Sequence, residues 1–449
     1  MDVKNQKFFV LGVSKSGAAV ADYVLSRGGK CFLYEELESE KITKTLERLK
    51  NSGGVIVDGS CVDAALSETD VLVISPGVPI NHRVAVKAKE SGVKIIGELE
   101  FGYRSFLPVI IAVTGTNGKT TTVSMIESGL KKAGISAPAV GNIGVPLTEK
   151  SCDIHRSDYV VCEVSSFQLE SVDSFTPHIA CVLNIAPDHL ERHYTMENYV
   201  FLKKRILRNM RESEYAILNY DDETVKSFSN GAKCKILYVS AKEKVDGAYR
   251  SDGKLYYKDE YVMEESALSV RGEHNVYDAL FALAALKICG VKTETVKAAL
   301  SEFRGVKHRI ELVAESSGVK YFDDSKATNV ASALTAAKSM TSPTVIILGG
   351  SEKGETYEEL FEKLKESKVY HAVITGASRF NMMKDAEKSG FTDYTVTGDF
   401  KRAVSIAKMI AKNGDNVLLS PACASFDSFN NYEERGNAFV KAVGTGDDE

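Results

Sequence analysis

The sequence predicts an α/β protein with three domains in series. Its 449 residues correspond to about three domains of ordinary size. Short apolar runs alternate with helix-like segments along most of the chain, which is typical of parallel sheets. Near residues 236–270 the pattern changes to short aromatic-rich runs. We therefore expect a Rossmann-like N-terminal domain (1–97), a central α/β domain with a small antiparallel sheet (98–303) and a Rossmann-like C-terminal domain (304–449).

The composition excludes several classes of protein. Hydrophobic residues make up 44% and charged residues 26% of the chain, as in ordinary folded proteins. The net charge of −5 argues against a nucleic-acid partner, because a surface that tracks phosphates needs an excess of cations. Apolar runs stay well short of the ~18 residues of a membrane span, and the N-terminus lacks the features of a signal peptide. We therefore expect a cytoplasmic protein that binds neither nucleic acid nor a membrane.

The eight cysteines form no C-x-x-C pair, and most of them lie in apolar segments. We therefore expect buried, reduced thiols rather than disulfides or zinc ligands.

The individual elements follow from apolar periodicity. Strands are predicted at residues 8–12, 30–34, 71–74 and 93–96, then at 109–113, 159–163 and 179–184, and finally at 319–322, 344–348, 372–375 and 416–419. Helices are predicted at 17–27, 122–133, 196–210 and 274–289, and a hairpin turn at Asp252-Gly253. Ligands of open α/β sheets bind beyond the carboxyl ends of the strands, so we expect the chemistry in the loops that follow them.

The strongest functional motif lies between the predicted strand at 109–113 and a helix-like run. Residues 114–121 read T-G-T-N-G-K-T-T, which departs from the G-x-x-x-x-G-K-[ST] pattern because Val113 stands at the position of its first glycine. Glycines let backbone N–H groups turn toward phosphate oxygens, the lysine supplies a mobile cation, and the next hydroxyl suits Mg²⁺. We interpret the segment as the ATP-binding loop of a P-loop ATPase-type domain. It consists of Gly115, Thr116, Asn117, Gly118, Lys119, Thr120 and Thr121.

A second glycine loop, residues 12–17, follows the first predicted strand. Ser14 stands where the G-x-G-x-x-G fingerprint has its middle glycine, so a bare turn and a nucleotide site remain alternatives. The loop Ser75-Pro76-Gly77, after another strand of the same segment, would complete such a site.

Polar side chains end two predicted strands of the central segment. Glu163 ends the strand at 159–163, and the next strand runs into N-I-A-P-D-H over residues 184–189. Taken alone, Glu163 is as typical of a solvated strand end as of a ligand, and a lone histidine is more often structural. The convergence of these strand ends on the phosphate loop favours a magnesium site.

Lys203 lies on the predicted helix at 196–210, within F-L-K-K-R-I. From the residues alone this segment is a basic, solvated helix face. Lys204 lies about 100° further around the helix, so only one of the two lysines can face a site.

Seven motifs occur in order along the chain: T-G-T-N-G-K-T-T, E-V-S-S-F-Q-L-E, N-I-A-P-D-H-L-E-R-H, G-E-H-N, H-R-I-E, D-D-S-K-A-T-N and S-P-A-C-A-S-F-D. Together they resemble the Mur ligases of peptidoglycan synthesis over essentially the whole chain. Within that family, the D-S-K-A-T-N, L-G-G-S-E-K-G and S-P-A-C-A-S blocks resemble those of members that add D-glutamate to UDP-N-acetylmuramoyl-L-alanine. The resemblance implies that the first domain holds the UDP-sugar, the second ATP and Mg²⁺, and the third the amino acid, with an acyl phosphate as intermediate. We expect a monomer.

The resemblance also implies roles for individual residues. Lys119 would contact the β- and γ-phosphates, Thr120 and Glu163 would bind one Mg²⁺, and His189 would join a second magnesium site. Lys203 matches the lysine that this family carries as a carbamate, an anion able to ligate Mg²⁺. Further ATP contacts would be Asn275, Asp278, Arg309, Asp324 and Lys326. Contacts to the UDP substrate would be Ser14, Lys15, Ser16, Glu35, Ser75, Gly77, Asn142 and Ser165. The D-glutamate site would comprise Thr328, Lys353, Ser425, Phe426 and Tyr432.

The chain departs from the family pattern in places. The usual H-N-x-x-N has Asp278 at its last position, and an aspartate can accept a hydrogen bond from an adenine amino group but cannot donate one. Lys15 and the Glu35-Glu36 pair are also unusual for binding UDP.

Three alternatives remain open at this point. The first is a sister ligase, of the Mur or folylpolyglutamate type, that uses another amino acid. The second is a P-loop ATPase or nucleotide switch, which would hydrolyse ATP without an amine acceptor. The third is a non-enzymatic nucleotide-sugar sensor, which would leave Lys119, Glu163 and Lys203 unexplained.

Overall fold

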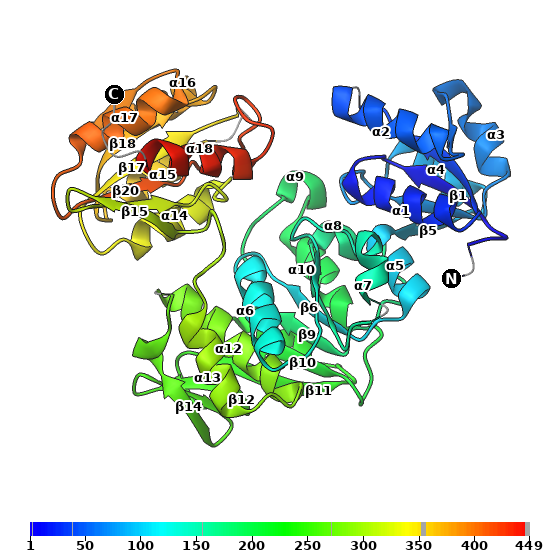
Figure 1. Ribbon diagram of the computed structural model, residues 1–449, viewed down its shortest axis with the longest axis horizontal. Helices are drawn as coiled ribbons and strands as arrows, with labels where there is room; N and C mark the ends of the chain where they lie inside the picture. Colours follow the sequence, from blue (N-terminus) through cyan, green and yellow to red (C-terminus); the bar gives the residue numbers. More distant parts are fainter. Residues whose placement is uncertain (2, 38, 155, 271, 352–355, 445–449) are drawn as a thin grey trace. The chain divides into compact units, whose positions relative to one another are not determined.

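The computed structural model describes residues 1, 3–37, 39–154, 156–270, 272–351 and 356–444 (Figure 1). Within these residues the strands form three sheets, of five, nine and six strands. The chain divides into two compact units, residues 1–269 with 273–303 and residues 304–449 with 270–272. The first unit contains two of the sheets and the second unit contains the third, which confirms the predicted α/β architecture.

The N-terminal sheet is parallel and has the order β3-β2-β1-β4-β5. Apolar clusters cover both of its faces, as the near-continuous apolar strands require. Its strands are β1 (Lys7–Leu11), β2 (Lys30–Tyr34), β3 (Val55–Ile56), β4 (Val71–Ile74) and β5 (Lys94–Gly97). Its helices are α1 (Lys15–Ser26), α2 (Glu40–Asn51), α3 (Val62–Ser67) and α4 (Arg83–Glu90), and α5 (Glu98–Phe106) leads to the next sheet.

The central sheet has the order β14-β13-β12-β11-β10-β9-β6-β8-β7. Its parallel strands are β6 (Ile110–Thr114), β7 (Ala139–Gly141), β8 (Val160–Glu163), β9 (Ile179–Val182), β10 (Tyr215–Asn219) and β11 (Lys235–Ser240). β6 is fully buried and pairs in parallel with both β8 and β9. The carboxyl ends of these three strands therefore meet at one edge of the sheet, where we expected the chemistry.

The predicted antiparallel region consists of β12 (Gly247–Ser251), β13 (Lys254–Tyr257) and β14 (Glu260–Glu264). Asp252 and Gly253 form the predicted turn, with φ values of 49° and 69° that suit a two-residue hairpin. β12 also pairs in parallel with β11, so these strands extend the large sheet instead of standing apart from it.

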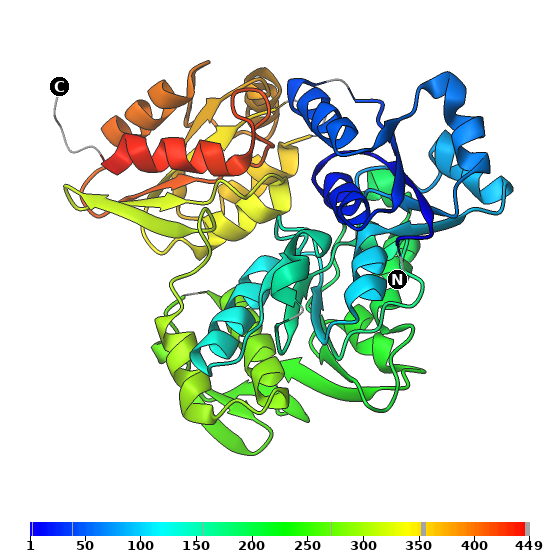
Figure 2. The ribbon, with the colours of Figure 1, turned by 45° about the vertical axis from the view of Figure 1, so that its right-hand side comes forward.

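Helices cover both faces of the central sheet. On one face α6 (Lys119–Lys132) packs against α12 (Glu273–Ile288) and α13 (Thr293–Glu302), and α6 and α12 lie side by side in Figures 1 and 2. The remaining helices are α7 (Ser151–Ile154), α8 (Ser166–Leu169), α9 (Leu190–His193), α10 (Met196–Lys204) and α11 (Glu223–Lys226). The helix predicted at 196–210 ends earlier than expected, because Arg205–Leu207 form a 3₁₀ turn after α10.

The second unit contains a mixed sheet of order β15-β16-β20-β17-β18-β19, in which only β15 and β16 pair antiparallel. Its strands are β15 (Glu311–Ser316), β16 (Val319–Asp323), β17 (Thr344–Gly349), β18 (Val369–Thr375), β19 (Tyr394–Val396) and β20 (Asn416–Leu419). Its helices are α14 (Val330–Ser339), α15 (Glu358–Leu364), α16 (Arg379–Lys388), α17 (Phe400–Ile410) and α18 (Tyr432–Gly444).

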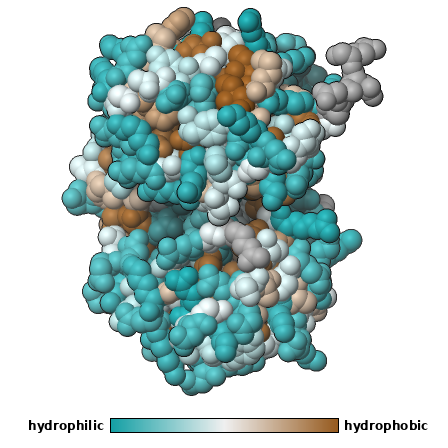
Figure 3. Space-filling view, turned by 90° about the vertical axis from the view of Figure 1, so that its left-hand side faces the viewer, coloured by the Kyte–Doolittle hydropathy of each residue, from teal (hydrophilic) through white to brown (hydrophobic). Residues whose placement is uncertain are grey.

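Among the described residues, each helix is too short or too polar to cross a bilayer. Hydrophilic atoms cover most of the face drawn in Figure 3, with hydrophobic atoms in separate patches. Of the seven cysteines whose side chains are described, Cys31, Cys162, Cys181 and Cys423 are buried as predicted, but Cys234 and Cys289 are only partly buried and Cys61 is exposed.

One buried carboxylate anchors α5 to the central sheet. Glu100 is fully buried and accepts hydrogen bonds from the backbone N–H groups of Asp173, Ser174 and Phe175 at 2.9, 2.9 and 3.0 Å. These three residues lie just before β9. Burial acts to raise the pKa of Glu100. Hydrogen bonds from Ser174, Asp173 and Arg104 nevertheless keep this pKa below its ordinary value.

We predict that Glu100→Gln lowers the free energy of unfolding by about 3 kcal/mol at pH 7, because an amide cannot satisfy so many buried donors. A carboxylate with a lowered folded-state pKa stabilises the fold above its unfolded pKa of ~4.3, and this stabilisation is lost as the pH falls through the folded-state value. The deficit of the variant should therefore shrink at pH 3. Urea unfolding at both pH values measures it, with the exposed Glu47→Gln as control. A deficit of equal size at both pH values would contradict the assigned ionisation.

Candidate active site around the phosphate loop

The phosphate loop joins β6 to α6, as predicted. Lys119 folds back over the loop, and its Nζ donates hydrogen bonds to the carbonyl oxygens of Gly115 (2.9 Å) and Thr116 (2.8 Å). Asn184, just after β9, holds the loop from the other side: its Oδ1 accepts from the N–H of Asn117 at 2.8 Å. The N-terminus of a 14-residue helix, a glycine loop and a lysine thus form an anion-binding arrangement.

Glu163 stands beside this loop because β8 is the neighbour of β6. Its carboxylate is buried, with 2% of the residue exposed, so it is not a solvated strand end. Oε2 accepts a hydrogen bond from the Thr120 hydroxyl at 2.8 Å, and Oε1 accepts one from Nδ2 of Asn142 at 2.8 Å. The structure therefore brings together three of the predicted site residues, and the oxygens of Thr120 and Glu163 are the kind of ligand that Mg²⁺ prefers.

Lys203 is buried, with 2% of the residue exposed, which overturns the reading of its helix face as solvated. Its Nζ donates to the carbonyl oxygen of Gly115 at 2.8 Å and lies 4.7 Å from the centre of the Tyr199 ring. Burial first, and then the positive charge of Lys119, lower the pKa of Lys203 well below its ordinary value. Lys204 points elsewhere and lies over the Phe228 ring, so only one of the two lysines reaches the site.

His189 precedes α9 and adopts a left-handed backbone conformation with φ of 53°. Its side chain is 46% exposed, its Nε2 lies 3.6 Å from a carboxylate oxygen of Asp188, and its ring lies 4.8 Å from the Phe167 ring. The negative charges of Asp188 and Glu163 both act to raise the pKa of Lys203. Asp188 therefore lies close enough to Lys203 to act on its charge. Sequence reasoning named Asp188 only as the neighbour of His189.

Asp278 lies behind the phosphate loop. Its Oδ1 accepts a hydrogen bond from the Thr122 hydroxyl at 3.0 Å, and a Cβ added to Gly118 would lie 2.3 Å from the same oxygen. The residue is buried and belongs to α12, as does the partly buried Asn275. The structure thus gives Asp278 a supporting contact with the loop, and its predicted contact with adenine stays a prediction.

The N-terminal glycine loop is held by two of the predicted residues. Glu35 Oε2 accepts from the N–H of Val13 at 2.8 Å, and the buried Ser75 hydroxyl donates to the carbonyl oxygen of Gly12 at 2.7 Å. Lys15 reaches the central domain and donates to the carbonyl oxygen of Gly144. Glu35 and Ser75 therefore brace the loop, whereas Ser14 and Gly77 are exposed and Ser16 and Ser165 are partly buried.

A polar cluster missed by sequence reasoning lies at the end of β2. Glu36 forms an ion pair with Arg83 at 2.7 Å and accepts a hydrogen bond from the Tyr34 hydroxyl at 2.8 Å. Hydrogen bonds from Tyr34 and then His82 lower the pKa of Glu36 to about 2. The available signal was the pair of carboxylates, Glu35 and Glu36, that follows this strand.

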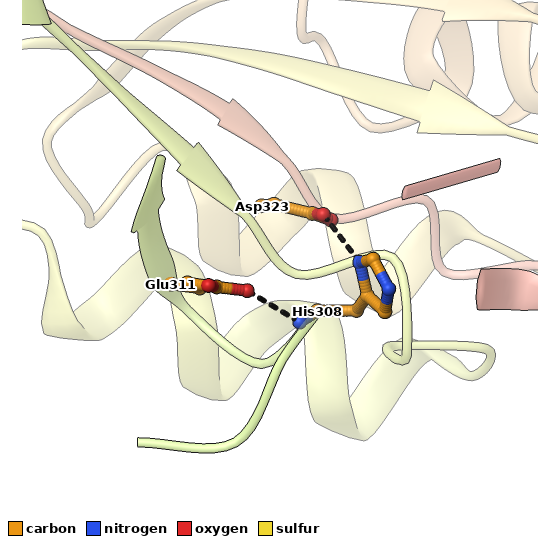
Figure 4. A group of neighbouring side chains, drawn as sticks. All are labelled: His308, Glu311 and Asp323. Atoms are coloured by element: carbon orange, nitrogen blue, oxygen red, sulfur yellow. Dashed lines mark hydrogen bonds and ion pairs between the residues drawn. The ribbon is translucent and has the colours of Figure 1, made fainter. Parts of the chain in front are cut away.

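In the second unit, three side chains brace the segment that carries Arg309. His308 Nδ1 lies 2.6 Å from Oδ2 of Asp323, and Glu311 accepts from the backbone N–H of His308 at 2.9 Å (Figure 4). Their donor atoms lie close enough together to suggest a metal site. Oδ1 of Asp323 accepts from the N–H of Ser325 at 2.9 Å, so the hydrogen bonds within the segment already account for this grouping.

Asp324 is also buried, and its carboxylate accepts from the Ser420 hydroxyl at 2.7 Å and from the N–H of Ile310 at 3.3 Å. Burial raises the pKa of Asp324 to about 7. Lys326 Nζ lies 5.5 Å from the Tyr432 ring, which brings two of the predicted residues together.

The remaining predicted residues of this unit differ in exposure. Ser425 is buried, Phe426 is 73% exposed, and Thr328 is partly buried. Lys353 lies outside the described residues. Sequence reasoning missed Arg435, which is buried and donates to the carbonyl oxygens of Ser325 (2.8 Å) and Cys423 (3.0 Å). An arginine on an amphipathic helix is normally solvated, so the sequence carried no signal for this role.

This combination of sheets with a phosphate loop is the architecture of the Mur ligases. Three family models match the chain: "Mur ligase MurD-like, N-terminal domain" at residues 6–97, "Mur ligase middle domain" at 113–286 and "Mur ligase, glutamate ligase domain" at 308–423. The chain belongs to the Mur ligase family.

Individual relatives cover the whole chain. A UDP-N-acetylmuramoylalanine–D-glutamate ligase of Caldanaerobacter subterraneus subsp. tengcongensis is 39% identical over 446 residues, which are 99% of both chains. The protein of the same name from Pelotomaculum thermopropionicum is 38% identical over 98% of both chains. Among solved structures, the UDP-N-acetylmuramate–alanine ligase of Thermotoga maritima is similar in fold, with a TM-score of 0.62, 20% identity, and coverage of 97% of this chain and 99% of that one.

We predict that Gly118→Ala weakens nucleotide binding and lowers the free energy of unfolding by about 1–3 kcal/mol, because φ is 84° at this position and the new Cβ would meet the Asp278 carboxylate. Gly134→Ala is the matched control, since its φ of 77° is similar and its Cβ would meet nothing within 4 Å. Calorimetric titration with a nonhydrolysable ATP analogue, together with thermal unfolding, measures both effects. Equal losses in the two variants would mean that the clash with Asp278 is unimportant.

Proposed function

We propose that this protein joins D-glutamate to UDP-N-acetylmuramoyl-L-alanine at the expense of ATP, as an ATP-dependent acid–amino-acid ligase of peptidoglycan precursor synthesis. The observation that carries the proposal is the grouping of Lys119, Thr120, Glu163 and Lys203 around one phosphate loop. The names of the relatives that are 38–39% identical over the full chain support the choice of substrates.

The chemistry requires an activated carboxylate. The alanyl carboxylate attacks the γ-phosphorus of ATP, the bond from that phosphorus to the bridging oxygen breaks, and ADP leaves. The amine of D-glutamate then attacks the carbonyl carbon of the acyl phosphate and loses a proton, and the tetrahedral intermediate expels phosphate to leave the amide. Charge on the transferred phosphoryl group must be neutralised, and Lys119 and the N-terminus of α6 are suited to this.

The residues present fit a magnesium ion. Glu163 and Thr120 offer a carboxylate and a hydroxyl oxygen that already lie within 2.8 Å of each other. We propose that they hold one Mg²⁺ and that His189 and Lys203 contribute to a second. When bound, the metal would neutralise phosphate charge during transfer.

The surroundings of Lys203 favour the formation of a carbamate on its amine. Burial and the charge of Lys119 lower the pKa of Lys203, which favours the neutral amine. Only the neutral amine adds to the carbon of CO₂, releasing a proton and leaving an anionic carbamate. The product would place a negative charge next to the cation of Lys119.

The remaining assignments are also part of the proposal. Residues 1–97 would hold the UDP-sugar, with contacts from Ser14, Lys15, Ser16, Ser75, Gly77, Asn142 and Ser165. Residues 98–303 would hold ATP, with contacts that include Asn275 and Asp278. Arg309, Asp324 and Lys326, which come later in the chain, would add further contacts to ATP. Residues 304–449 would hold D-glutamate, through Thr328, Lys353, Ser425, Phe426 and Tyr432. Glu35 would act by bracing the glycine loop. We place the reaction in the cytoplasm and expect a monomer.

We predict that phosphate release from Mg-ATP depends on both UDP-N-acetylmuramoyl-L-alanine and D-glutamate, and that Lys119→Ala abolishes it without unfolding the chain. A panel of D- and L-amino acids with mass detection of the product measures this. Lys132→Ala, on the exposed end of the same helix, is the control. Release with ATP alone would indicate an ATPase, and product with another amino acid would indicate a sister ligase.

We predict that Lys203→Ala is inactive and regains part of its activity with added short carboxylic acids, because these can supply the oxygens of the missing carbamate. Turnover at increasing acetate or formate concentration tests this, and Lys204→Ala serves as the control because its side chain points away from the site. If no acid at any concentration restores turnover, the carbamate assignment loses its support.

A further inference from the structure

One buried histidine near the site has no part in the proposed chemistry. His193 ends α9, and only 1% of it is exposed. Its Nε2 lies 2.9 Å from the Ser166 hydroxyl, and within the described residues its Nδ1 has no hydrogen-bond partner. The nearest acidic oxygen to Nδ1 belongs to Glu170, at 3.5 Å. A buried polar atom without a partner costs stability, so an apolar ring would suit a purely structural position better.

The ring of His193 contacts two other aromatic rings, and we call these three tilted rings the aromatic stack. The ring centre of Phe167 of α8 lies at 5.2 Å from it, and that of Tyr199 of α10 lies at 5.4 Å. Both neighbours are tilted by 36° relative to the imidazole ring. The stack therefore fixes three short helices against one another.

Each outer ring of this stack contacts a residue of the proposed site. Phe167 lies 4.8 Å from the ring of His189. Tyr199 faces Nζ of Lys203 at 4.7 Å, and its hydroxyl lies 3.0 Å from Oγ1 of Thr116 in the phosphate loop. One ring thus connects the two side chains that we assign to the second metal site.

We propose that His193 is a positioning residue that sets the spacing of His189 and Lys203 through Phe167 and Tyr199, and so determines the affinity of the second metal site. The inference rests on the proposed function, since it takes these two residues as ligands. His193 itself touches neither substrate nor metal. Its hydrogen bond to Ser166 fixes the rotation of the ring, and its volume keeps α8 and α10 at the right separation.

The test measures metal binding separately from turnover. Mn²⁺ replaces Mg²⁺, and electron paramagnetic resonance follows its binding to the full chain in the presence of a nonhydrolysable ATP analogue. We expect His193→Ala to weaken the second Mn²⁺ site and to lower kcat by about 10–100-fold, as is typical when residues that orient metal ligands are lost. The affinity for the ATP analogue itself should stay unchanged. His193→Phe should bind Mn²⁺ more tightly than His193→Ala, because it keeps the stacked ring.

The control is Phe175→Ala, which removes a buried ring of the same domain from the segment before β9, away from the carboxyl ends of the strands. It should cost stability and leave the affinity for Mn²⁺ as in the wild type. If His193→Ala fails to fold, His193→Leu replaces it, since leucine fills the space without a ring. Wild-type Mn²⁺ affinity in His193→Ala or His193→Leu would overturn the inference.

The two proposals fail in different ways. A wild-type protein that binds Mn²⁺ with nucleotide but makes no D-glutamyl product contradicts the proposed function, while the Mn²⁺ affinities still decide the role of His193. A fully active ligase whose His193 variants bind Mn²⁺ normally contradicts only the positioning role.

Discussion

The parallel pairing of β6 with β8 on one side and β9 on the other is the constraint on which the rest of the site depends. It brings the phosphate loop, Glu163 and the segment from Asn184 to His189 to one edge of the central sheet. Each of these lies directly after its strand, so no long or flexible connection is needed to assemble them. A shift of one residue in either register would turn Glu163 or the loop toward the opposite face.

This constraint explains which parts of the site could be predicted from the sequence. The strands, the glycine loop and the acidic strand end are local patterns, and their convergence follows from the rule for parallel sheets. Lys203 could not be placed in this way, because the segment F-L-K-K-R-I is as basic as any solvated helix face. Its burial depends on the packing of α10 against α8 and α9, which no local pattern encodes. Arg435 and His193 were missed for the same reason, because their contacts with Ser325 and Tyr199 are tertiary.

The hydrogen bonds of the structure also explain two departures from the family pattern. Lys15 and Glu35 are unusual for the family at positions that bind UDP. In the structure the Glu35 carboxylate accepts three backbone N–H bonds, one of them from Val13 of the glycine loop, and the Lys15 amine donates to a backbone carbonyl of the central domain. Residue type alone is therefore a weak guide at positions where a charged side chain can satisfy the backbone.

The charges around the phosphate loop suggest how the proposed metal ions and the proposed carbamate would act together. Lys119 and Lys203 both donate to the carbonyl oxygen of Gly115, and the positive charge of Lys119 makes protonation of the buried Lys203 less favourable. Glu163, Asp188 and Asp278 surround the same loop with carboxylates that would repel a triphosphate. Cations bound between these carboxylates and the phosphates would remove that repulsion, and a carbamate on Lys203 would add another anionic ligand for them while relieving the repulsion between the two lysines. The charges of the proposed nucleotide, metal ions and carbamate would therefore depend on one another.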